Sequence, residues 1–511
     1  MSNRTRLRPP DREFFRLVSE AAACNPFADR YLELLQSIAG CDASVASLEC
    51  LERMERRVHE RVRRLEAENA ANVKLFEGDE RQTVRDALLF DVYWRFMAAF
   101  DDLIERQVEA GDRSLPVPFA REVLGELARK GFAPDEAARY LAIGYQIRRA
   151  FFFIDRSLVG RSPCMKALRR HLWNNVFTHD MRLYERHLWN RMEDFSTLLL
   201  GETGTGKGAA ATAIGRSGFI PFDEKKGCFA ESFMRGFIAL NLSQFPETLI
   251  ESELFGHRKG AFTGAVETHE GVFARCSPCG AIFLDEIGDV TVPVQIKLLQ
   301  VLQERTFSPV GSHEKQRFRG RVIAATNKSL DTLRAGGQFR DDFFFRLCSD
   351  VVVVPPLRQR IQEAPEELDD LIALTVRRMT GAASGEIVAL VRDVLDRAGA
   401  GNRGTGPGAD RGTGLQPCAG NAGYAWPGNV RELEQAVRRI LLTREYSGER
   451  RQPPPDLAGR LQSGIADGSL DADALLAGYC RLLYDRHHTY EEVARRTRLD
   501  RRTVKAYVGR A

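Results

Sequence analysis

The chain has 511 residues, too many for one hydrophobic core, and this length predicts about three domains. Hydrophobic residues make up 43% and charged residues 28%, a composition typical of globular proteins that excludes wholesale disorder and fibrous repeats. The net charge of +4 is too small to indicate a partner, so the local distribution of basic residues has to be considered instead.

The first 15 residues do not resemble a signal peptide. They are charged and contain two prolines where an apolar run would be needed, and no stretch of the chain approaches about 18 uncharged apolar residues. We therefore expect a cytoplasmic protein. Of the ten cysteines, only Cys276 and Cys279 are closely spaced, without the second pair that a zinc site needs, so buried thiols are expected.

Residues 17–192 have the pattern of helices. Between residues 48 and 65 apolar side chains recur every three or four positions among dense charge, which predicts an amphipathic helix, with a coiled-coil partner as one interpretation. The region has no catalytic constellation and no receiver-domain pattern. Signal sensing, partner binding and support of oligomerisation all stay open for it.

From residue 195 to 354, short apolar runs alternate with helical patterns. The runs are STLLL, FIALN, AIFLD, RVIAA and DVVVV. Such alternation predicts a parallel sheet flanked by helices. Helices then dominate to residue 443, and the glycine-rich stretch 398–423 is expected to be a disordered loop.

A glycine-rich phosphate-binding motif follows the first of these runs and precedes an alanine-rich helix. Its backbone amides can surround a phosphate, and its lysine can neutralise the β and γ phosphates. The predicted nucleotide-contacting residues are Gly201, Glu202, Thr203, Gly204, Thr205, Gly206, Lys207 and Gly208. Gly208 stands where a general loop of this kind has a Ser or Thr ligand for magnesium, so the metal would depend on other ligands or the site would be impaired.

Two other strands are predicted to end in polar groups. Asp285 and Glu286 follow the run AIFLD, and Asn327 follows the run RVIAA. Asp285 is predicted to hold Mg²⁺, Glu286 to activate the attacking water, and Asn327 to hold the water or the γ-phosphate. Parallel strands bring their carboxyl ends to one edge, which supports a shared site.

The hexapeptide at residues 260–265 has the sequence GAFTGA. Its small residues free the backbone to project, which would present Phe262 as an apolar contact and Thr263 as a polar contact. The alternative is a turn whose phenylalanine folds back into the core.

The C-terminal stretch 489–508 fits a helix-turn-helix with helices near 490–496 and 500–507. Residues 486–511 contain seven Arg and one Lys against two Glu and one Asp, a surplus of five positive charges that suits phosphate contacts. The predicted DNA-contacting residues are Arg501, Arg502, Thr503 and Lys505. A solvated helical hairpin is the alternative.

Residues 159–443 resemble the AAA+ ATPases, and specifically the bacterial enhancer-binding proteins that activate sigma-54 RNA polymerase. The resemblance lies in the motifs GETGTGKG, ESELFGHRKGAFTGA, AIFLDEIGDV, RVIAATN, FRDDFFFRL, VPPLRQR and WPGNVRELEQAV. It implies trans-acting arginine fingers at Arg340 and Arg346, a sensor II arginine at Arg431 and a glutamate-switch asparagine at Asn241. It also implies sigma-54 contact by Phe262 and Thr263, ATP and Mg²⁺ as cofactors, and assembly into a ring of six or seven subunits.

This sequence departs from the family at three places. Gly208 replaces a glutamate that is usual there, and because the family already lacks the hydroxyl ligand, metal binding would depend on Asp285 and solvent in any case. The approach at residues 169–194 looks longer than usual, and the glycine-rich stretch 398–423 interrupts a region expected to be helical.

The predicted fold class is α/β: a P-loop parallel sheet with a helical lid, a helical N-terminal region and a C-terminal helix-turn-helix. The predicted parts are residues 1–156 (N-terminal region), 157–356 (ATPase core), 357–445 (lid with insertion 398–423), 446–475 (linker) and 476–511 (DNA-binding domain).

Three functions are compatible with the sequence. The favoured one is an ATPase that binds DNA upstream of a promoter and remodels closed sigma-54 polymerase into the open complex. The second is an ATP-responsive DNA-binding regulator without sigma-54 contact, which the intact GAFTGA run disfavours. The third is a silent pseudo-ATPase, which Gly208 suggests.

Overall fold

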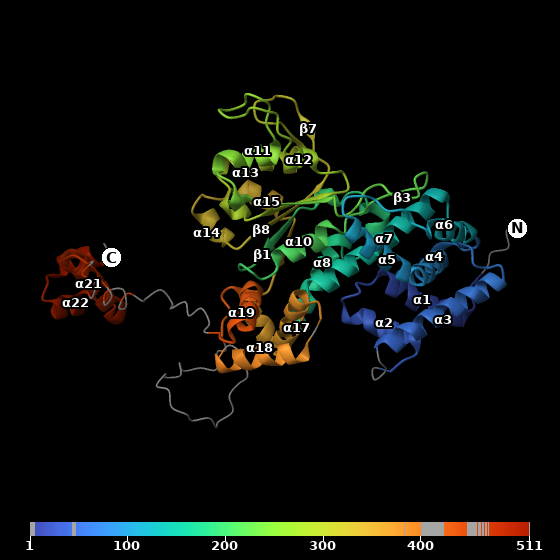
Figure 1. Cartoon of the computed structure of the whole chain (residues 1–511), viewed down its shortest axis with the longest axis horizontal. Helices are drawn as coiled ribbons and strands as arrows, with labels where there is room; N and C mark the ends of the chain where they lie inside the picture. The colour runs from blue at the N-terminus through green and yellow to red at the C-terminus, as the bar shows by residue number, and fades with distance from the viewer. Residues whose placement is uncertain are drawn as a thin grey trace, which may run out of the picture. The chain divides into compact units, whose positions relative to one another are not determined.

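The computed structural model describes residues 6–42, 47–382, 384–399, 424–446 and 470–509, with a few single positions between 457 and 468. It divides into two compact units, residues 1–446 and 447–511, which we describe separately (Figure 1). Among the described residues, no helix is long and apolar enough to cross a membrane.

In its described residues, the first unit begins with nine helices. They are α1 (Pro9–Ala23), α2 (Asp29–Ala39), α3 (Ser47–Ala67), α4 (Gly78–Arg95), α5 (Met97–Ala110), α6 (Ala120–Arg129), α7 (Pro134–Ser157), α8 (Pro163–Phe177) and the short α9 (Met181–Leu183). Proline occupies the first turn of α1, α7 and α8, where its missing N–H costs no helical hydrogen bond. Single turns follow at Val73–Leu75, Tyr184–Leu188 and Met192–Asp194.

The amphipathic helix predicted near residue 48 is α3. Met54, Val58 and Val62 lie at the spacing predicted for one helical face, and all three are fully buried. This face packs against α2 and α4 of the same chain. The coiled-coil interpretation is therefore wrong, because the chain itself covers the apolar stripe.

A five-stranded parallel sheet forms the centre of the first unit. Its strands are β1 (Thr197–Leu200), β4 (Phe237–Asn241), β5 (Ala281–Asp285), β8 (Arg321–Thr326) and β9 (Asp350–Val353), in the spatial order β4-β5-β8-β1-β9. Every one of the five apolar runs in the sequence is thus a strand. Buried parallel strands have no polar face, which explains why these runs are nearly continuous rather than alternating.

Helices and short strands connect this sheet. They are α10 (Lys207–Gly215), α11 (Glu247–Phe255), α12 (Val272–Arg275), α13 (Val292–Glu304), α14 (Leu330–Ala335) and α15 (Asp341–Leu347), with the pairs β2 (Phe222–Asp223) and β3 (Cys228–Phe229), and β6 (Thr306–Phe307) and β7 (Gln316–Arg317). Single turns lie at Leu242–Gln244 and Ile287–Asp289.

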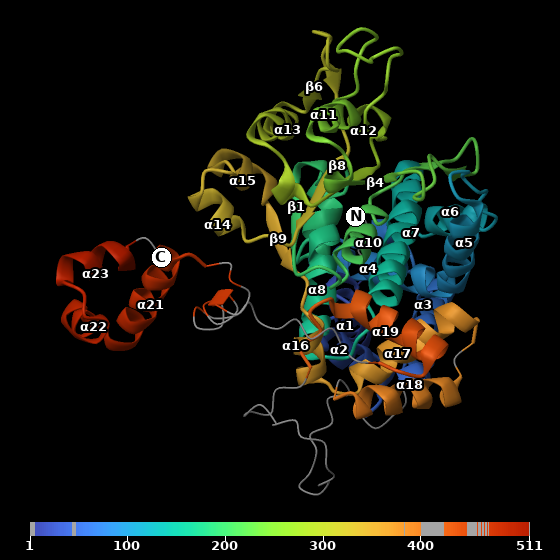
Figure 2. The same cartoon turned by 60° about the vertical axis from the view of Figure 1, so that its left-hand side comes forward.

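Successive side chains of the strands enter two different cores. Leu199 and Ile323 point into a core that continues into the N-terminal helices, whereas Leu198 and Val322 point into a core shared with α11 and α13. Figure 2 shows α7, α8 and α10 together beside the sheet. The N-terminal helices therefore cover one face of the ATPase-like core, and the boundary predicted at residue 156 falls at the end of α7.

Four helices form a lid with its own core. They are α16 (Leu357–Glu363), α17 (Glu367–Thr380), α18 (Gly385–Arg397) and α19 (Asn429–Thr443), packed around the fully buried Trp426. The glycine-rich stretch predicted as a loop lies outside the described residues from residue 400 to 423.

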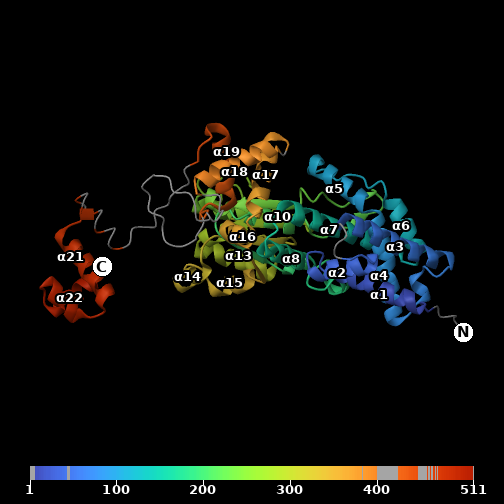
Figure 3. The ribbon, with the colours of Figure 1, turned by 90° about the horizontal axis from the view of Figure 1, so that it is seen from below.

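The second unit contains α21 (Ala472–His487), α22 (Tyr490–Thr497) and α23 (Arg501–Val508). Figure 2 labels all three, and Figure 3 shows α21 and α22 from below. Cys480, Val493 and Val504 form its buried centre. The two helices expected near residues 490–496 and 500–507 are α22 and α23. Most of the predicted linker 446–475 lies outside the described residues, and α21 begins four residues before the predicted boundary at 476.

Candidate functional site

The predicted phosphate loop connects β1 to α10. Gly204 and Gly206 have φ angles of +80° and +108°, a backbone region that favours glycine. A Cβ atom at Gly204 would also lie 2.2 Å from the carbonyl oxygen of Gly428 in the lid. Gly204 is therefore required both by the turn and by the close approach of the lid, whereas Gly206 is required by the turn alone.

Lys207 lies inside this loop. Its side chain is buried, and its Nζ donates hydrogen bonds to the carbonyl oxygens of Gly201 at 2.8 Å and Glu202 at 3.1 Å. Burial lowers the pKa of Lys207, while the negative charges of Glu286 and Asp285 act in the opposite direction. The structure thus brings the predicted lysine and the predicted carboxylates into one electrostatic environment.

Asp285 ends β5 and Glu286 follows it with a left-handed φ of +57°. The backbone N–H of Glu286 donates a 3.0 Å hydrogen bond to Oδ1 of Asp285. Burial, and then repulsion by Asp285, raise the pKa of Glu286. Oε2 of Glu286 is buried and has no hydrogen-bond partner among the described residues, so it can accept a proton or a water hydrogen.

Two asparagines flank these carboxylates. Nδ2 of Asn327 donates a 2.8 Å hydrogen bond to Oγ1 of Thr203 in the phosphate loop. Asn241 pairs in register with Asp285 on the neighbouring strand. Its Oδ1 accepts hydrogen bonds from the N–H and hydroxyl of Ser243 at 3.0 and 2.8 Å. In the described part of the chain, Asn241 is adjacent to the carboxylate pair without a hydrogen bond to Glu286.

Gly208 lies in the first turn of α10. A Cβ added there meets no atom within 4 Å, so packing does not require glycine at this position. The structure therefore leaves room for a larger side chain where this sequence has none.

The lid contacts the phosphate loop through residues that sequence reasoning missed. Arg358 of α16 donates two hydrogen bonds to the Glu202 carboxylate, at 2.8 and 2.6 Å. Asn429 donates to the same carboxylate and to the carbonyl oxygen of Thr203, both at 3.1 Å. The N–H of Val430 donates a 3.0 Å hydrogen bond to the Gly204 carbonyl oxygen.

Arg431 follows Val430 in α19, and its side chain is exposed. Its positive charge acts to lower the pKa of Lys207, which places it within electrostatic reach of the loop. The signal for Arg358 and Asn429 was present in the motifs VPPLRQR and WPGNVRELEQAV, but no role had been assigned to these positions.

The predicted arginine fingers lie on a different part of the core. Arg340 forms two hydrogen bonds with Asp342, at 3.0 and 2.7 Å, and Arg346 donates two to the carbonyl oxygen of Leu302, at 3.0 and 2.8 Å. Within the described residues, neither arginine hydrogen-bonds to the phosphate loop of its own chain. The structure does not bring them together with Lys207.

The GAFTGA hexapeptide lies in the loop between α11 and α12 (Figure 2). The N–H of Gly260 donates a 2.8 Å hydrogen bond to the Ala265 carbonyl oxygen and closes the turn. Phe262 is 38% exposed, and its ring lies edge-on to His257 with 4.9 Å between centroids. The phenylalanine therefore does not fold back into the core. Thr263 is exposed.

Three of the predicted DNA-contacting side chains are basic and lie on one helix. Arg501, Arg502 and Lys505 are exposed on α23. The hydroxyl of Thr503 donates a 2.5 Å hydrogen bond to Asp500, which caps the helix, so Thr503 already has a structural partner. Arg498 occupies the turn with a φ of +57°, at the position where glycine is usual.

A family described as "Sigma-54 interaction domain" matches residues 179–353. A "Nif-specific regulatory protein" of Azotobacter vinelandii is 32% identical over 333 residues, which cover 63% of this chain and 53% of the relative. A "DNA-binding transcriptional regulator NtrC" of Azospirillum brasilense is 36% identical over 296 residues, 57% of this chain and 49% of the relative. The "Regulatory protein AtoC" of Escherichia coli (strain K12) is 35% identical over 326 residues, 60% of this chain and 61% of the relative.

The chain thus spans about half the length of the first two of these relatives. Among solved structures, NtrX from Brucella abortus in complex with ATP is 20% identical with a TM-score of 0.39, covering 76% of this chain and 80% of that one. The family match covers the phosphate loop, the carboxylate pair and the GAFTGA loop. Residues 179–353 are therefore a sigma-54 interaction domain, of the type that sigma-54-dependent enhancer-binding activators carry.

Proposed function

We propose that this chain hydrolyses ATP to remodel the closed complex of sigma-54 RNA polymerase into the open complex, from a site on upstream DNA. The observation that carries the proposal is the combination, within one sigma-54 interaction domain, of a lysine-bearing phosphate loop with an exposed GAFTGA loop. The phosphate loop would supply chemical energy through ATP hydrolysis, and the GAFTGA loop would supply the contact with the polymerase.

The residues around the phosphate loop suit hydrolysis. Lys207 would neutralise phosphate charge, and Glu286 would orient and deprotonate the attacking water. Its raised pKa supports this role, because a carboxylate with a higher pKa is a stronger base. Asn327 and Arg431 would contact the phosphates from the strand edge and the lid.

The carboxylates also fit Mg²⁺. Among the described residues no group of three or more acidic, His or Cys side chains could enclose a metal ion. Mg²⁺ bound with a nucleotide does not need such a cage, because it uses one or two carboxylates together with phosphates and waters. Asp285 would supply the protein ligand, and bound Mg²⁺ would neutralise charge on the transferred phosphate.

Hydrolysis would require assembly. Among the described residues, Arg340 and Arg346 hydrogen-bond to Asp342 and Leu302 and not to their own phosphate loop, which supports a role at the site of a neighbouring subunit in a ring of six or seven. A planar guanidinium suits this role because it can neutralise charge over several phosphoryl oxygens.

The two remaining contacts would be made by exposed segments. Phe262 and Thr263 would contact sigma-54, and Arg501, Arg502 and Lys505 would contact DNA phosphates or bases, with Thr503 beside them on α23. Because the polymerase and its promoter are the partners, we expect the protein to act in the cytoplasm.

The test is open-complex formation in vitro with purified chain, sigma-54 holoenzyme and a supercoiled sigma-54 promoter. We expect open complexes with ATP but not with a non-hydrolysable analogue, and none with a holoenzyme carrying a different sigma factor. ATP hydrolysis without any effect on sigma-54 promoters would favour the DNA-binding regulator. Absence of hydrolysis by the assembled protein would favour the pseudo-ATPase.

A further inference from the structure

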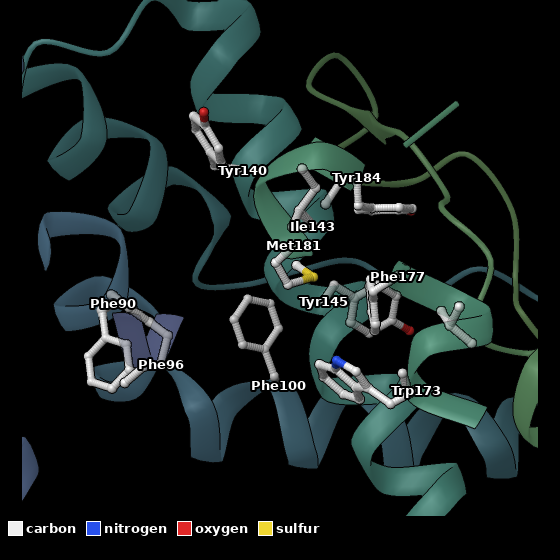
Figure 4. Packing of buried hydrophobic residues seen from close by; sticks show 14 of the residues in the cluster. Phe90, Phe96, Phe100, Tyr140, Ile143, Tyr145, Trp173, Phe177, Met181 and Tyr184 are labelled. Carbon is white, nitrogen blue, oxygen red and sulfur yellow. The ribbon is translucent and has the colours of Figure 1, made fainter. Parts of the chain in front are cut away.

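The N-terminal helices form a partly open cavity of about 440 Å³. It is lined mainly by apolar side chains, and the large ones include Phe90, Trp94, Phe96, Phe100, Phe151 and Trp173. Figure 4 shows the lining residues Phe90, Phe100, Tyr140, Trp173 and Met181, which come from five different helices. A mostly apolar cavity of this size with a few polar groups in its wall has the character of a small-molecule site.

The charged groups in the wall of the cavity are already paired. Asp86 accepts a 2.6 Å hydrogen bond from Ser19 and lies 3.5 Å from Arg182, and Glu185 accepts one from Tyr140. A ligand would therefore gain little from bringing a charge of its own, because no opposite charge is free to receive it. The paired charges in the wall therefore favour a neutral ligand.

Two polar groups in the wall lack a hydrogen-bond partner among the described residues. Nε1 of Trp94 is buried without a partner. The hydroxyl of the partly buried Tyr31 also makes no hydrogen bond, and burial raises the pKa of Tyr31. Its neighbour Tyr93, by contrast, hydrogen-bonds with Arg148. An open hydroxyl and an open indole N–H in an aromatic wall match a mostly apolar ligand with one oxygen atom, because both groups can donate a hydrogen bond to an oxygen.

One helix joins the cavity to the phosphate loop. On α7, Ile143, Gly144 and Ile147 line the cavity. From the same helix, Gln146 donates a 2.9 Å hydrogen bond to the Ser217 carbonyl oxygen, at the end of α10.

Arg149, also on α7, donates to the carbonyl oxygens of Arg216 and Gly218, both at 2.7 Å. Because α10 begins at Lys207, a displacement of α7 would reach the helix that carries the phosphate lysine.

We propose that this cavity binds a neutral, planar organic molecule of two or three rings with one oxygen atom, and that α7 transmits its occupancy to the phosphate loop. The size follows from the volume, because an apolar cavity of about 150 Å³ accepts benzene. Aromatic walls favour a planar ligand through stacked and edge-on contacts. The binding part is independent of the proposed function, whereas the transmission part rests on ATP being the ligand of the phosphate loop.

The binding test is equilibrium dialysis of the full chain against 2-naphthol and naphthalene, with 2-naphthoate as the charged analogue. We expect 2-naphthol to bind, and 2-naphthoate to bind at least about tenfold more weakly because its charge finds no partner. Absence of binding by all three probes up to their solubility limits would show that the cavity is not a ligand site. Equal or tighter binding of 2-naphthoate would overturn the neutral class.

Two variants locate the bound probe. Leu89→Trp fills the cavity from α4 and should abolish 2-naphthol binding, whereas Leu48→Trp, a matched change at an exposed position outside the cavity, should leave it unchanged. Tyr31→Phe keeps the shape of the wall, so it remains informative if Leu89→Trp does not fold. It should weaken 2-naphthol binding about fivefold and leave naphthalene binding unchanged. Unaltered 2-naphthol binding by folded Leu89→Trp, or by Tyr31→Phe, would place the ligand elsewhere.

Transmission is tested by measuring ATP affinity and hydrolysis with and without saturating 2-naphthol. For the natural chain we expect 2-naphthol to change the ATP affinity or the hydrolysis rate at least about twofold. For Leu89→Trp we expect no change in either. If 2-naphthol changes the ATP affinity, ATP should change the 2-naphthol affinity by the same factor. Identical values at saturation would overturn the transmission while leaving the binding site in place. Open-complex formation without probe tests the proposed function separately.

Discussion

The side chain of Asn429, at the start of the last lid helix, donates a 3.1 Å hydrogen bond to the Glu202 carboxylate in the phosphate loop. Its Oδ1 accepts a 2.7 Å hydrogen bond from the N–H of Leu357, at the start of the first lid helix. Asn429 is fully buried and has a φ of +53°, a conformation that asparagine tolerates better than most residues. Asn429 thus connects the start of α16 and the start of α19 to the phosphate loop.

We expect Asn429→Ala to lower the free energy of unfolding by about 1–3 kcal/mol, because it leaves the buried N–H of Leu357 without a partner. ATP affinity should also fall, because the lid loses the two hydrogen bonds that Asn429 donates to the loop. Chemical denaturation and nucleotide titration measure the two effects. Gln435→Ala, an exposed change on the same helix, should alter stability by less than about 0.5 kcal/mol. An unaffected Asn429→Ala protein would show that the lid is held by other contacts.

Glu286→Gln should retain ATP binding and lose hydrolysis by about 10²–10⁴-fold, because the phosphate cradle is kept while the base is removed. Single-turnover hydrolysis measured beside nucleotide titration separates the two. If this variant hydrolyses ATP at the natural rate, another group activates the water.

The raised pKa of Glu286 predicts a pH dependence. The base is active when ionised, so turnover should fall as the pH drops through this raised pKa, at a higher pH than for an ordinary glutamate. A pH profile of the hydrolysis rate under saturating ATP measures it. A profile that stays flat down to the ordinary range of glutamate would contradict the assignment.

Arg346→Ala should strongly lower turnover and spare nucleotide binding, because the role we propose for this arginine is at the site of a neighbouring subunit. Specific activity of the natural chain should therefore rise steeply with protein concentration. The sharper measurement mixes Arg346→Ala with Glu286→Gln. Each variant alone should have little activity. The mixture should regain activity at sites where one subunit supplies an intact Glu286 and its neighbour supplies an intact Arg346. A mixture as inactive as its components would refute a role in trans.

Changing both Arg502 and Lys505 to alanine should weaken promoter binding and reduce its salt dependence by about one or two counterions. Both side chains are exposed on α23, so the fold and ATP hydrolysis should survive. Arg438→Ala, which removes a half-exposed arginine from the lid, is the matched control. Unchanged DNA binding by the double variant would show that another surface of the protein contacts DNA.

The five strands and the phosphate loop could be predicted because their signals are local. A short apolar run that ends in a carboxylate, an amide or a glycine loop specifies both a strand and the edge at which it ends. In the same way, the local helix-turn-helix pattern of residues 489–508 was sufficient to predict α22 and α23.

The remaining features depend on contacts between distant parts of the chain. Arg358 and Asn429 reach Glu202 across 156 and 227 positions, and no local pattern specifies such a pairing. The apolar stripe of α3 was visible, but its partner was not, because a stripe shows which face is covered without showing what covers it. A cavity is formed by side chains from several helices together, so no single helix reveals it.

The most direct measurement of the central claim is transcription in vitro from a sigma-54 promoter by Thr263→Ala, with ATP hydrolysis measured on the same preparation. Thr263 is exposed in a projecting loop, so its truncation should spare folding, assembly, DNA binding and hydrolysis while open-complex formation is lost. Glu267→Ala truncates an exposed side chain of the same loop outside the hexapeptide and should activate transcription normally. Normal activation by Thr263→Ala would contradict the account and favour a DNA-binding regulator without sigma-54 contact.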